Sequence, residues 1–413
     1  MLSLFSLSGC GQNTSEATSE IPATSAETLS VSVETTVPAD AAADSVSADP
    51  VCVDLVPASR IQESSSTVEE QILAGPYSFS LGFAGDINFA DNYIPMQHLT
   101  SIESTSISDG IDPRYIDLMQ SMDLMWINNE FVYSDRGEPL YGKMWTFRSA
   151  PEHVSYMHDL GVDIVGLANN HCYDYGEDAF LDTLTTLEDA GIPYVGGGRT
   201  LDDVMAPVYL ETNGFTIAYV AASNCEYTIY TPEATEDSPG ILWCYEWDRF
   251  LEAIRTADAN ADFVVALPHW GTEHSTELTW DQTEGAHACI DAGADAVIDA
   301  HPHILQGIEY YNEKPILYSL GNFWFDDYYI DTMVAELRFT GTRNENGTAS
   351  LDDADLNVVL HPGTQFGIYT HWADTEEWRE QIFDHLEAIS GYAIEIDSDG
   401  VLHDASEEVT VAA

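Results

Sequence analysis

The chain has 413 residues, enough for one large α/β domain with appendages or for two domains, and 45% of them are apolar, ample for a packed core. Its charge is extreme, because 12 Lys and Arg residues stand against 71 Asp and Glu residues, for a formal net charge of -59. A surface of that sign repels nucleic acid and anionic lipid, so the composition excludes both as binding partners.

The first ten residues end in Leu7-Ser8-Gly9-Cys10, which resembles the lipoprotein box of a bacterial signal peptide. Only nine residues precede Cys10, and the first basic residue is Arg60, whereas a signal peptide has a basic region and an apolar run of about 7–15 residues. Either this is a clipped signal, with the true start upstream, or the match is accidental. We favour the clipped signal, and therefore expect a lipid anchor on Cys10 and an extracytoplasmic, membrane-anchored lipoprotein.

Residues 11–76 are rich in Ser, Thr, Ala and Glu and contain almost no aromatic residues. Such a composition cannot bury enough apolar surface to offset the entropy lost on ordering, so we expect a disordered stalk. The globular body is expected to begin at residue 77, with a main domain at 77–327 and an extension at 328–413. Outside the stalk, no stretch of sequence approaches the roughly 20 consecutive apolar residues of a membrane span.

Within the body, apolar runs that predict strands end in polar side chains. The central one, Ile164–Leu167, leads into Asn169-Asn170-His171, where the two amides either serve as ligands or only make turn hydrogen bonds. Asp174 and Glu177 then have the N-cap and N3 spacing of a helix start, so we assign Asp174 to the helix cap. The other strands of this kind are Phe79–Ala84, Leu124–Asn128, Phe263–Leu267 and Ala296–Asp299.

Helices are predicted between these strands, and hairpins toward the C-terminal half. The turn Asn213-Gly214 joins two alternating strands, and Asn312 lies between two more. This order indicates two sheets between helices. The aromatic segment Asn224–Trp247 is interpreted either as a lid or, more simply, as a packed insert. The predicted helices are Pro113–Met122, one opened by Pro151, one that ends at Ala190, Asp248–Ala259, Trp280–Ala292 and Thr375–Ile389.

The polar residues that follow the strands form a pattern. Parallel strands deliver their carboxyl ends to one edge of a sheet, so we predict that these side chains converge on one pocket. Each histidine taken alone is more often a satisfied interior residue, but carboxylates, amides and imidazoles together are the donors of a two-metal hydrolytic site. Hard oxygens mixed with imidazoles favour Mn, Fe or Zn over Ca or Cu(I). The residues are Asp86, Glu130, Asn170, His171, His269, Glu273, His301 and His303.

Several sequence blocks resemble, in the same order, those of the CapA-type capsule-synthesis proteins. These proteins are associated with poly-γ-glutamate capsules and share the calcineurin-like metallophosphoesterase fold. The resemblance runs from about Phe79 to Phe323, and it implies a four-layer α/β/β/α sandwich with a small C-terminal α+β extension. The blocks are F-A-G-D, N-N-E, A-N-N-H-C-Y-D-Y-G, H-W-G-T-E, A-H-P-H-I-L-Q-G and Y-S-L-G-N-F.

The resemblance also implies roles for individual residues. His171 would be the catalytic proton donor, and Glu273 would either orient His269 or serve as an acid or base. Asn88 stands where the metallophosphoesterases have a first-motif His, and Glu130 is one methylene longer than their Asp. These two departures leave open whether the site holds two divalent metal ions, one or none. The implied metal ligands are Asp86, Glu130, Asn170, His269, His301 and His303.

On this resemblance we expect a protein of poly-γ-glutamate capsule biosynthesis. Its partners would be poly-γ-glutamate or another capsule polymer and the membrane proteins that make or export it. Two functions remain open: a metal-dependent hydrolase acting on a phosphoester or on the amide bonds of the polymer, or a non-catalytic module that binds the polymer or assists its export. In an exported protein Cys225 and Cys244 have the opportunity to form a disulfide, but their spacing alone does not show one.

We predict that proteases cut residues Gly11–Gly75 much faster than the body, since an unpacked segment leaves its backbone accessible. Limited proteolysis followed by mass spectrometry should place the early cuts in this segment and leave a stable core that begins near residue 77. Early cuts within the body, with the segment intact, would contradict the prediction.

Overall fold

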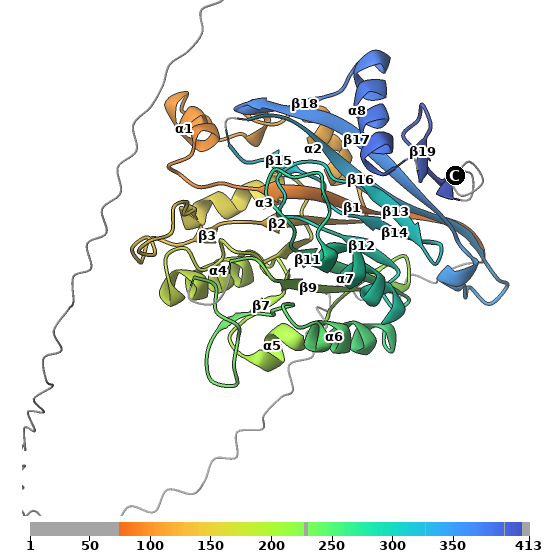
Figure 1. The fold of residues 1–413 in the computed structure, drawn as a ribbon, viewed down its shortest axis with the longest axis horizontal. Helices are drawn as coiled ribbons and strands as arrows, with labels where there is room; N and C mark the ends of the chain where they lie inside the picture. Colours follow the sequence, from red (N-terminus) through yellow and green to blue (C-terminus); the bar gives the residue numbers. More distant parts are fainter. Residues whose placement is uncertain (1–73, 227–229, 327, 392, 407–413) are drawn as a thin grey trace, which may run out of the picture. The chain divides into compact units, whose positions relative to one another are not determined.

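The computed structural model describes residues 74–226, 230–326, 328–391 and 393–406 (Figure 1). Cys10, Cys52 and nearly all of the segment expected to be a stalk therefore lie outside the described residues. The strands of the larger sheet are β1 (Gly75–Ile87), β2 (Leu124–Asn129), β5 (Ile164–Gly166), β6 (Tyr194–Val195), β15 (Asn322–Trp324), β16 (Tyr328–Arg343), β17 (Asp355–Gly367) and β18 (Tyr369–Trp372). They form an eight-stranded sheet in the order β18-β17-β16-β1-β2-β5-β6, with β15 beside β1.

A second sheet has six strands in the order β13-β14-β12-β11-β9-β8. The two predicted hairpins both lie in it: β8 pairs with β9 around Asn213-Gly214, and β13 pairs with β14 around Asn312. Its central strands are parallel, as are β1, β2, β5 and β6 in the larger sheet. The strands are β8 (Val208–Thr212), β9 (Phe215–Ser223), β11 (Phe263–His269), β12 (Ala296–Ile298), β13 (Ile308–Tyr311) and β14 (Lys314–Leu317).

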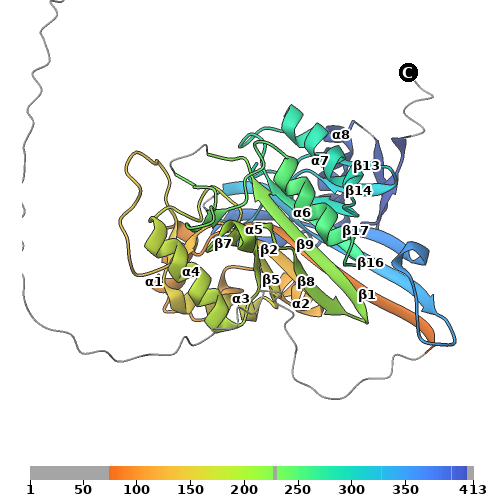
Figure 2. The same cartoon turned by 90° about the horizontal axis from the view of Figure 1, so that it is seen from below.

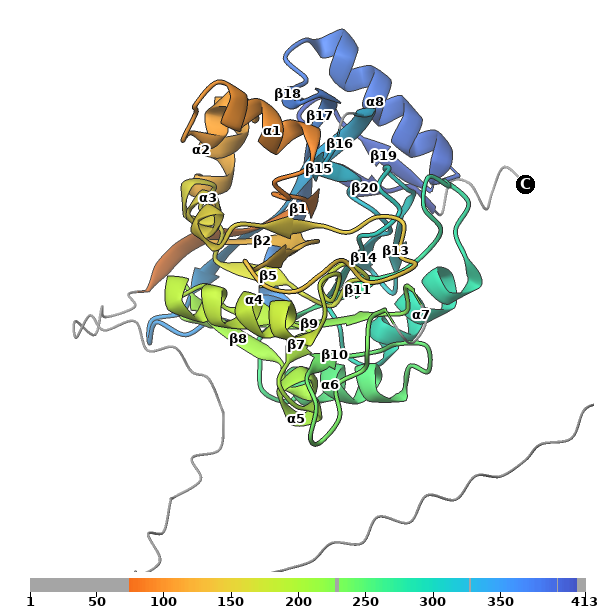
Figure 3. The ribbon, with the colours of Figure 1, turned by 90° about the vertical axis from the view of Figure 1, so that its left-hand side faces the viewer.

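The helices lie on the outer sides of the two sheets. Figure 1 shows α1, α2 and α8 beyond the larger sheet and α5 and α6 beyond the smaller one, and in Figure 3 the helices surround both sheets. Among the described residues, none of the helices combines the length and the apolar character needed to cross a bilayer. The helices are α1 (Ile94–Ser101), α2 (Pro113–Ser121), α3 (Ser155–Asp159), α4 (Glu177–Ala190), α5 (Leu201–Met205), α6 (Asp248–Asp258), α7 (Trp280–Asp291) and α8 (Glu376–Ile389).

The two sheets pack face to face, and strand β9 shows this directly. Ile217 and Tyr219 belong to the core that β9 shares with Phe83 of β1, whereas Ala218 belongs to a second core that includes Phe250 of α6. Successive residues of a strand point to opposite faces, so β9 is covered by the larger sheet on one side and by helices on the other. Figure 2 shows α6 lying along β9 on that outer side. The α/β class predicted from the sequence is confirmed.

Shorter elements complete the body. Leu242 and Cys244 are fully buried in the second core, so much of the aromatic segment 224–247 is a packed insert. The short strand pairs are β3 (Val132–Tyr133) with β4 (Arg148–Ser149), β7 (Gly197–Gly198) with β10 (Gly240–Ile241), and β19 (Ile394–Ile396) with β20 (Leu402–Asp404). The 3-10 helices are Ile107–Asp109, Pro151–Val154 and Leu351–Asp353.

The residues after 327 are part of the larger sheet rather than a separate addition. β16 runs antiparallel to β1 from Gly75↔Arg343 to Ala84↔Val334, and β17 and β18 continue the sheet outward. The division that the sequence analysis placed between residues 327 and 328 therefore crosses a sheet whose first strand is β1. Only α8 and the β19–β20 pair resemble the small extension that was expected.

Two glycines bring β1 and β15 unusually close where the sheet ends. A Cβ atom on Gly85 would fall on the carbonyl oxygen of Gly321, far inside van der Waals contact. Instead the next amide, that of Asp86, donates a hydrogen bond to that oxygen at 3.0 Å. Asp86 is consequently in register with Asn322. Gly321 also has a φ of 70°, which glycine adopts at little cost.

Truncating the chain after residue 327 should prevent folding. The shortened protein would lack β16, and the apolar residues of β1, including Phe79 and Leu81, would lie at a bare sheet edge that favours aggregation. We expect little soluble protein and no cooperative thermal transition, as measured by circular dichroism. Removal of residues 407–413 alone serves as the control and should leave the unfolding temperature unchanged. A stable, cooperatively folded 1–327 protein would contradict this prediction and show that residues 77–327 fold without β16–β18.

Candidate metal centre

Polar side chains from both sheets meet at one end of the molecule. Asp86 lies at the end of β1 and Glu130 follows β2, while His269 ends β11 and His301 and His303 follow β12. All of them are buried. Together with Cys225, these residues form two groups, and within each group the possible ligand atoms lie within 4.8 Å of one another. The first group is Asp86, Glu130 and His303, and the second is Cys225, His269 and His301.

The first group is organised by two asparagines. Nδ1 of His303 lies 2.7 Å from Oδ1 of Asn322 and 3.2 Å from Oδ2 of Asp86, so it carries the proton. Nε2 of His303 lies 3.9 Å from Oε1 of Glu130. Asn128 donates from Nδ2 to Oδ1 of Asp86 at 2.7 Å and lies 3.4 Å from Oε2 of Glu130. The two carboxylates and the imidazole thus face a common point.

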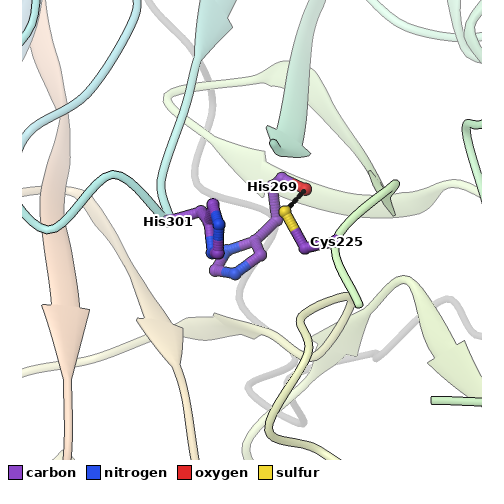
Figure 4. A group of neighbouring side chains, drawn as sticks. All are labelled: Cys225, His269 and His301. Atoms are coloured by element: carbon purple, nitrogen blue, oxygen red, sulfur yellow. Dashed lines mark hydrogen bonds between the residues drawn. The ribbon is translucent and has the colours of Figure 1, made fainter. Parts of the chain in front are cut away.

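The second group, drawn in Figure 4, lies beside the first, since the ring centroids of His301 and His303 are 6.0 Å apart. Nε2 of His269 is 2.9 Å from Oδ1 of Asn170 and 3.7 Å from Oε1 of Glu130. The rings of His269 and His301 are 4.8 Å apart. The thiol of Cys225 donates a hydrogen bond to the carbonyl oxygen of His269 at 3.3 Å. Asn170, which the sequence assigned as a ligand, therefore lies beside the second group.

The two histidines of the H-P-H block supply one imidazole to each group. His301 and His303 have φ values of 100° and 61°, in a region that non-glycine residues rarely adopt. The amide of His301 lies 3.4 Å from Oδ2 of Asp86, which ties the strained turn to β1. Backbone strain of this kind persists where the surrounding structure holds it, commonly at functional sites.

The pocket contains carboxylates that are not matched by cations. Burial raises the pKa of Glu130 well above its usual value, and the charge of Asp86 adds to the rise. Burial acts on Asp86 in the same direction, but the hydrogen bond and charge of His303 outweigh it and hold the pKa of Asp86 below its usual range. Burial lowers the pKa of His269 to about 3 and that of His301 well below its usual value. Two of the imidazoles are thus neutral ligand-type donors.

His171 lies beside the pocket, and its partner corrects one assignment. Asp174, assigned from the sequence to the helix cap, is not at the cap: α4 begins at Glu177 and its N-cap residue is Gly176. Oδ2 of Asp174 instead lies 2.7 Å from Nδ1 of His171. The prediction was wrong because the spacing of Asp174 and Glu177 fits a helix start locally, while a tertiary contact uses the carboxylate. Nε2 of His171 consequently faces the pocket, 4.0 Å from Oε1 of Glu130.

Asp174 also fixes the loop between β3 and β4. Its Oδ1 is paired with Nζ of Lys143 at 2.6 Å, its Oδ2 accepts from the amide of Phe147 at 2.6 Å, and its carbonyl oxygen accepts from the amide of Leu140. The Lys143 side chain is only 2% exposed and also pairs with Glu226. The ring of Phe147 packs on that of His171, with centroids 3.9 Å apart. The His171 ring is thus held at Nδ1 by Asp174 and on one face by Phe147.

Glu273 does not orient His269. Both ring nitrogens of His269 lie near amides, since Asn170 is beside Nε2 and Asn128 is 3.3 Å from Nδ1. Glu273 is exposed, although its charge is close enough to contribute to the raised pKa of Glu130. A role for Glu273 as an acid or base stays a prediction.

The sequence analysis missed several residues of the site. Asn128 was visible as the first residue of the N-N-E block, at the end of the predicted strand. Asn322 was visible in the block that ends Y-S-L-G-N-F. Lys143 carried no signal, because it lies within the connection between β3 and β4 and follows no predicted strand. Cys225 follows β9, but a thiol was not among the donor types considered. In the described part of the chain Cys225 and Cys244 are free thiols, so the disulfide left open by the sequence is not formed.

The residues present fit a bound metal ion. Considering only the residues that the structure describes, Oε1 of Glu130 and Nδ1 of His301 are buried without a hydrogen-bond partner. Buried polar atoms are normally paired, so two unpaired acceptor-type atoms in one pocket indicate that something else satisfies them. The donor set of carboxylates, amide oxygens and imidazoles suits a divalent transition metal. Asn88 does not add to this set, since its Oδ1 accepts from the amide of Ala90.

The fold and the site define a two-sheet α/β protein with buried carboxylate, amide and imidazole groups gathered at the ends of parallel strands. The chain belongs to the family described as bacterial capsule synthesis protein PGA_cap, whose sequence profile matches residues 80–327. It is 36% identical over 211 residues to the capsule biosynthesis protein CapA of Bacillus anthracis, covering 50% of each chain. It is 33% identical over 208 residues to the PGA biosynthesis protein CapA of Bacillus subtilis, covering 50% of this chain and 54% of that one.

The chain thus spans about half the length of the curated relatives it matches. Among solved structures, it is similar to a phosphatase of Mycoplasma pneumoniae with a TM-score of 0.41 and 11% identity, covering 75% of this chain and 99% of that one.

Replacing Glu130 with Gln should stabilise the metal-free protein at neutral pH. The folded state raises the pKa of Glu130, so it retains a proton that the unfolded chain releases above its ordinary pKa of 4.5. The wild type therefore loses stability as the pH rises above that value, whereas the Gln variant has no such loss at this position. Thermal unfolding in a chelator at about pH 5 and about pH 8 should show the gain mainly at the higher pH, with roughly 2–4 °C for each kcal/mol.

A second buried glutamate provides the control with the opposite sign. Burial raises the pKa of Glu336, but its hydrogen bonds to His361 and Arg338 outweigh this and lower it. Glu336→Gln should therefore destabilise the protein at neutral pH. If Glu130→Gln also destabilises the protein in the chelator, the conclusion that burial disfavours the charged form of Glu130 is wrong.

Proposed function

We propose that this protein acts in the biosynthesis of poly-γ-glutamate or a related capsule polymer, outside the cytoplasm, through a metal-dependent hydrolytic site. Membership of the capsule-synthesis family supports the process. The observation that carries the site is the position of Oε1 of Glu130. It is buried and faces three imidazole nitrogens, from His269 at 3.7 Å, His303 at 3.9 Å and His171 at 4.0 Å. A carboxylate oxygen at such distances from three imidazoles leaves space for a shared cation.

In this proposal Asp86, Glu130 and His303 hold one divalent ion, of Mn, Fe or Zn, and His269, His301 and Asn170 hold the other. A bound metal of this kind lowers the pKa of its water toward roughly 7 and polarises the scissile bond. The chain's own contribution is orientation, because Asn128 and Asn322 fix Asp86 and His303 before any substrate arrives.

His171 exchanges the proton in this proposal. Burial lowers the pKa of its imidazole well below the usual value, so the ring is neutral at rest. Its Nδ1 is bonded to Asp174, and its Nε2 faces the pocket. The ring can therefore accept a proton from a reacting group at Nε2 and return it to a leaving group, stabilised meanwhile by the carboxylate behind it.

The substrate is an anion-bearing polymer or ester that the metal ions, rather than the protein's cations, attract. Lys143, whose charge acts on His171, is already paired with Asp174 and Glu226. The net charge of -59 repels a polyanion over most of the surface. Productive binding then depends on the metal charge at the pocket, for a phosphoester and for the amide bonds of poly-γ-glutamate alike.

A second candidate function is a non-catalytic module that binds the polymer or assists its export. Asn88 favours it, since this residue replaces a metal-ligating His of related folds and is tied to the amide of Ala90. The partners in that case are membrane proteins of capsule synthesis or export, with a lipid on Cys10 as the anchor. In this reading the donor groups are retained for binding alone, and no bond is hydrolysed.

Replacing the two pocket histidines separates these functions. His303→Ala should lower the bound metal and the turnover together, because it removes a ligand of the first group. His171→Ala should leave the metal content unchanged and reduce turnover by on the order of 10²–10⁴-fold, the usual contribution of a proton-transfer group. Elemental analysis gives the metal content, and hydrolysis of an aryl phosphodiester and of poly-γ-glutamate gives the rates.

The matched control is His287→Ala. His287 pairs with Glu309 at the surface of the smaller sheet and has no place in the proposed site. It should change neither metal content nor rate. A wild type that binds metal yet hydrolyses neither substrate would favour the binding module.

A further inference from the structure

We propose that Cys225 is a metal ligand of the second group, so that this position binds its ion through a thiolate as well as imidazoles. The inference deepens the proposed function and rests on its metal site. None of the ligands implied by the family resemblance is a cysteine, so Cys225 changes the chemistry expected at this position.

The geometry places the thiol among the imidazoles. The ligand atoms of Cys225, His269 and His301 all lie within 4.8 Å of one another, and all three residues are buried. Figure 4 shows the sulfur beside the His269 ring, with the His301 ring on the other side of that ring. Zinc–sulfur and zinc–nitrogen bonds are about 2.3 Å and 2.0–2.1 Å long, so two atoms that share an ion lie at most about 4.4 Å apart. The three ligand atoms therefore need only a small approach to share one ion.

A second observation points to a ligand independently of the thiol. Within the described ranges, Nδ1 of His301 has no hydrogen-bond partner, although the residue is only 7% exposed. An unpaired buried imidazole nitrogen costs free energy that a bound ion would recover. This nitrogen belongs to His301, which is in the same group of possible ligands as Cys225.

The alternative is that Cys225 is a buried thiol whose only role is its bond to the carbonyl of His269. Cys172 makes a bond of the same kind to the carbonyl of Asn169 at 3.1 Å, and it does not belong to either donor group. A thiol–carbonyl bond therefore does not distinguish the two cysteines. Cys225 differs from Cys172 because two imidazoles, those of His269 and His301, lie beside its thiol.

The carbonyl of His269 also does not depend on the thiol. It accepts a hydrogen bond from Oγ of Ser223 at 3.0 Å and from the amide of Asn224 at 3.3 Å. If the thiol releases its proton to solvent and the thiolate binds an ion, this carbonyl stays satisfied. The local structure thus allows Cys225 to exchange a weak hydrogen bond for a metal–sulfur bond.

The two positions would then prefer different ions. The first group offers two carboxylates and one imidazole, a set that suits Mn or Fe. A thiolate with two imidazoles is a softer set, which suits Zn and tetrahedral Co. We therefore expect unequal affinities, with zinc held first and most tightly at the second group.

Cobalt titration of the chelator-treated protein tests the assignment without relying on activity. The wild type should develop the near-ultraviolet thiolate-to-cobalt charge-transfer band, and Cys225→Ser and Cys225→Ala should lose it while still folding. Zinc affinity should fall by at least the roughly 10–100-fold that loss of an outer partner costs. Cys172→Ala, which removes the comparable thiol, should keep both the band and the zinc affinity.

The outcomes separate this inference from the proposed function. Cobalt bound without a thiolate band, or a band that survives in Cys225→Ala, overturns the ligand assignment and leaves the hydrolytic site in place. A thiolate band that depends on Cys225 in a protein that hydrolyses neither substrate confirms the ligand and overturns the catalytic function. Absence of any cobalt or zinc binding overturns both.

Discussion

The structure depends on keeping two carboxylates, Asp86 and Glu130, buried in one pocket. Isolated buried charges are so costly that a protein neutralises or pairs them, and here the pairing is incomplete. His303 and Asn128 support Asp86, whereas Glu130 is left with an unpaired oxygen among the described residues. A bound cation would let both carboxylates ionise, and Asn128 already fixes their orientation.

Rigid elements supply the donors, and loops supply what positions them. The ligand-type residues come from strand ends of two sheets that share one core. The loop that carries Lys143 and Phe147 is bound to Asp174 at three points and packs on His171 through Phe147. One buried carboxylate thereby couples a long connection to the orientation of His171. The centre is thus assembled from strand ends that carry the ligand-type groups and from a loop that positions His171.

Much of this was predictable from sequence, and each miss has a specific cause. Buried parallel strands are apolar runs, so the strand ends that carry Asp86, His269 and His303 stood out by pattern alone. Asp174 was misassigned because its spacing to Glu177 satisfies a local rule, whereas its actual partners lie in other loops. Cys225 follows β9, the parallel neighbour of β11, but it was considered only for a disulfide because the donor pattern was read from carboxylates, amides and imidazoles alone. Likewise the pairing of β16 with β1 joins opposite ends of the body, which periodicity cannot reveal.

The contact between Gly85 and Gly321 has a consequence for how tolerance to substitution is interpreted. Neither residue has a side chain to offer, yet the separation of their backbones sets the register in which Asp86 and Asn322 face His303. Even alanine at position 85 would force β1 and β15 apart and displace Asp86 and Asn322 from His303. In a saturation screen for capsule production, position 85 would therefore score as severely as a ligand. Intolerance to substitution at Gly85 would thus reflect the close approach of two backbones. It would not by itself show that the residue takes part in the chemistry.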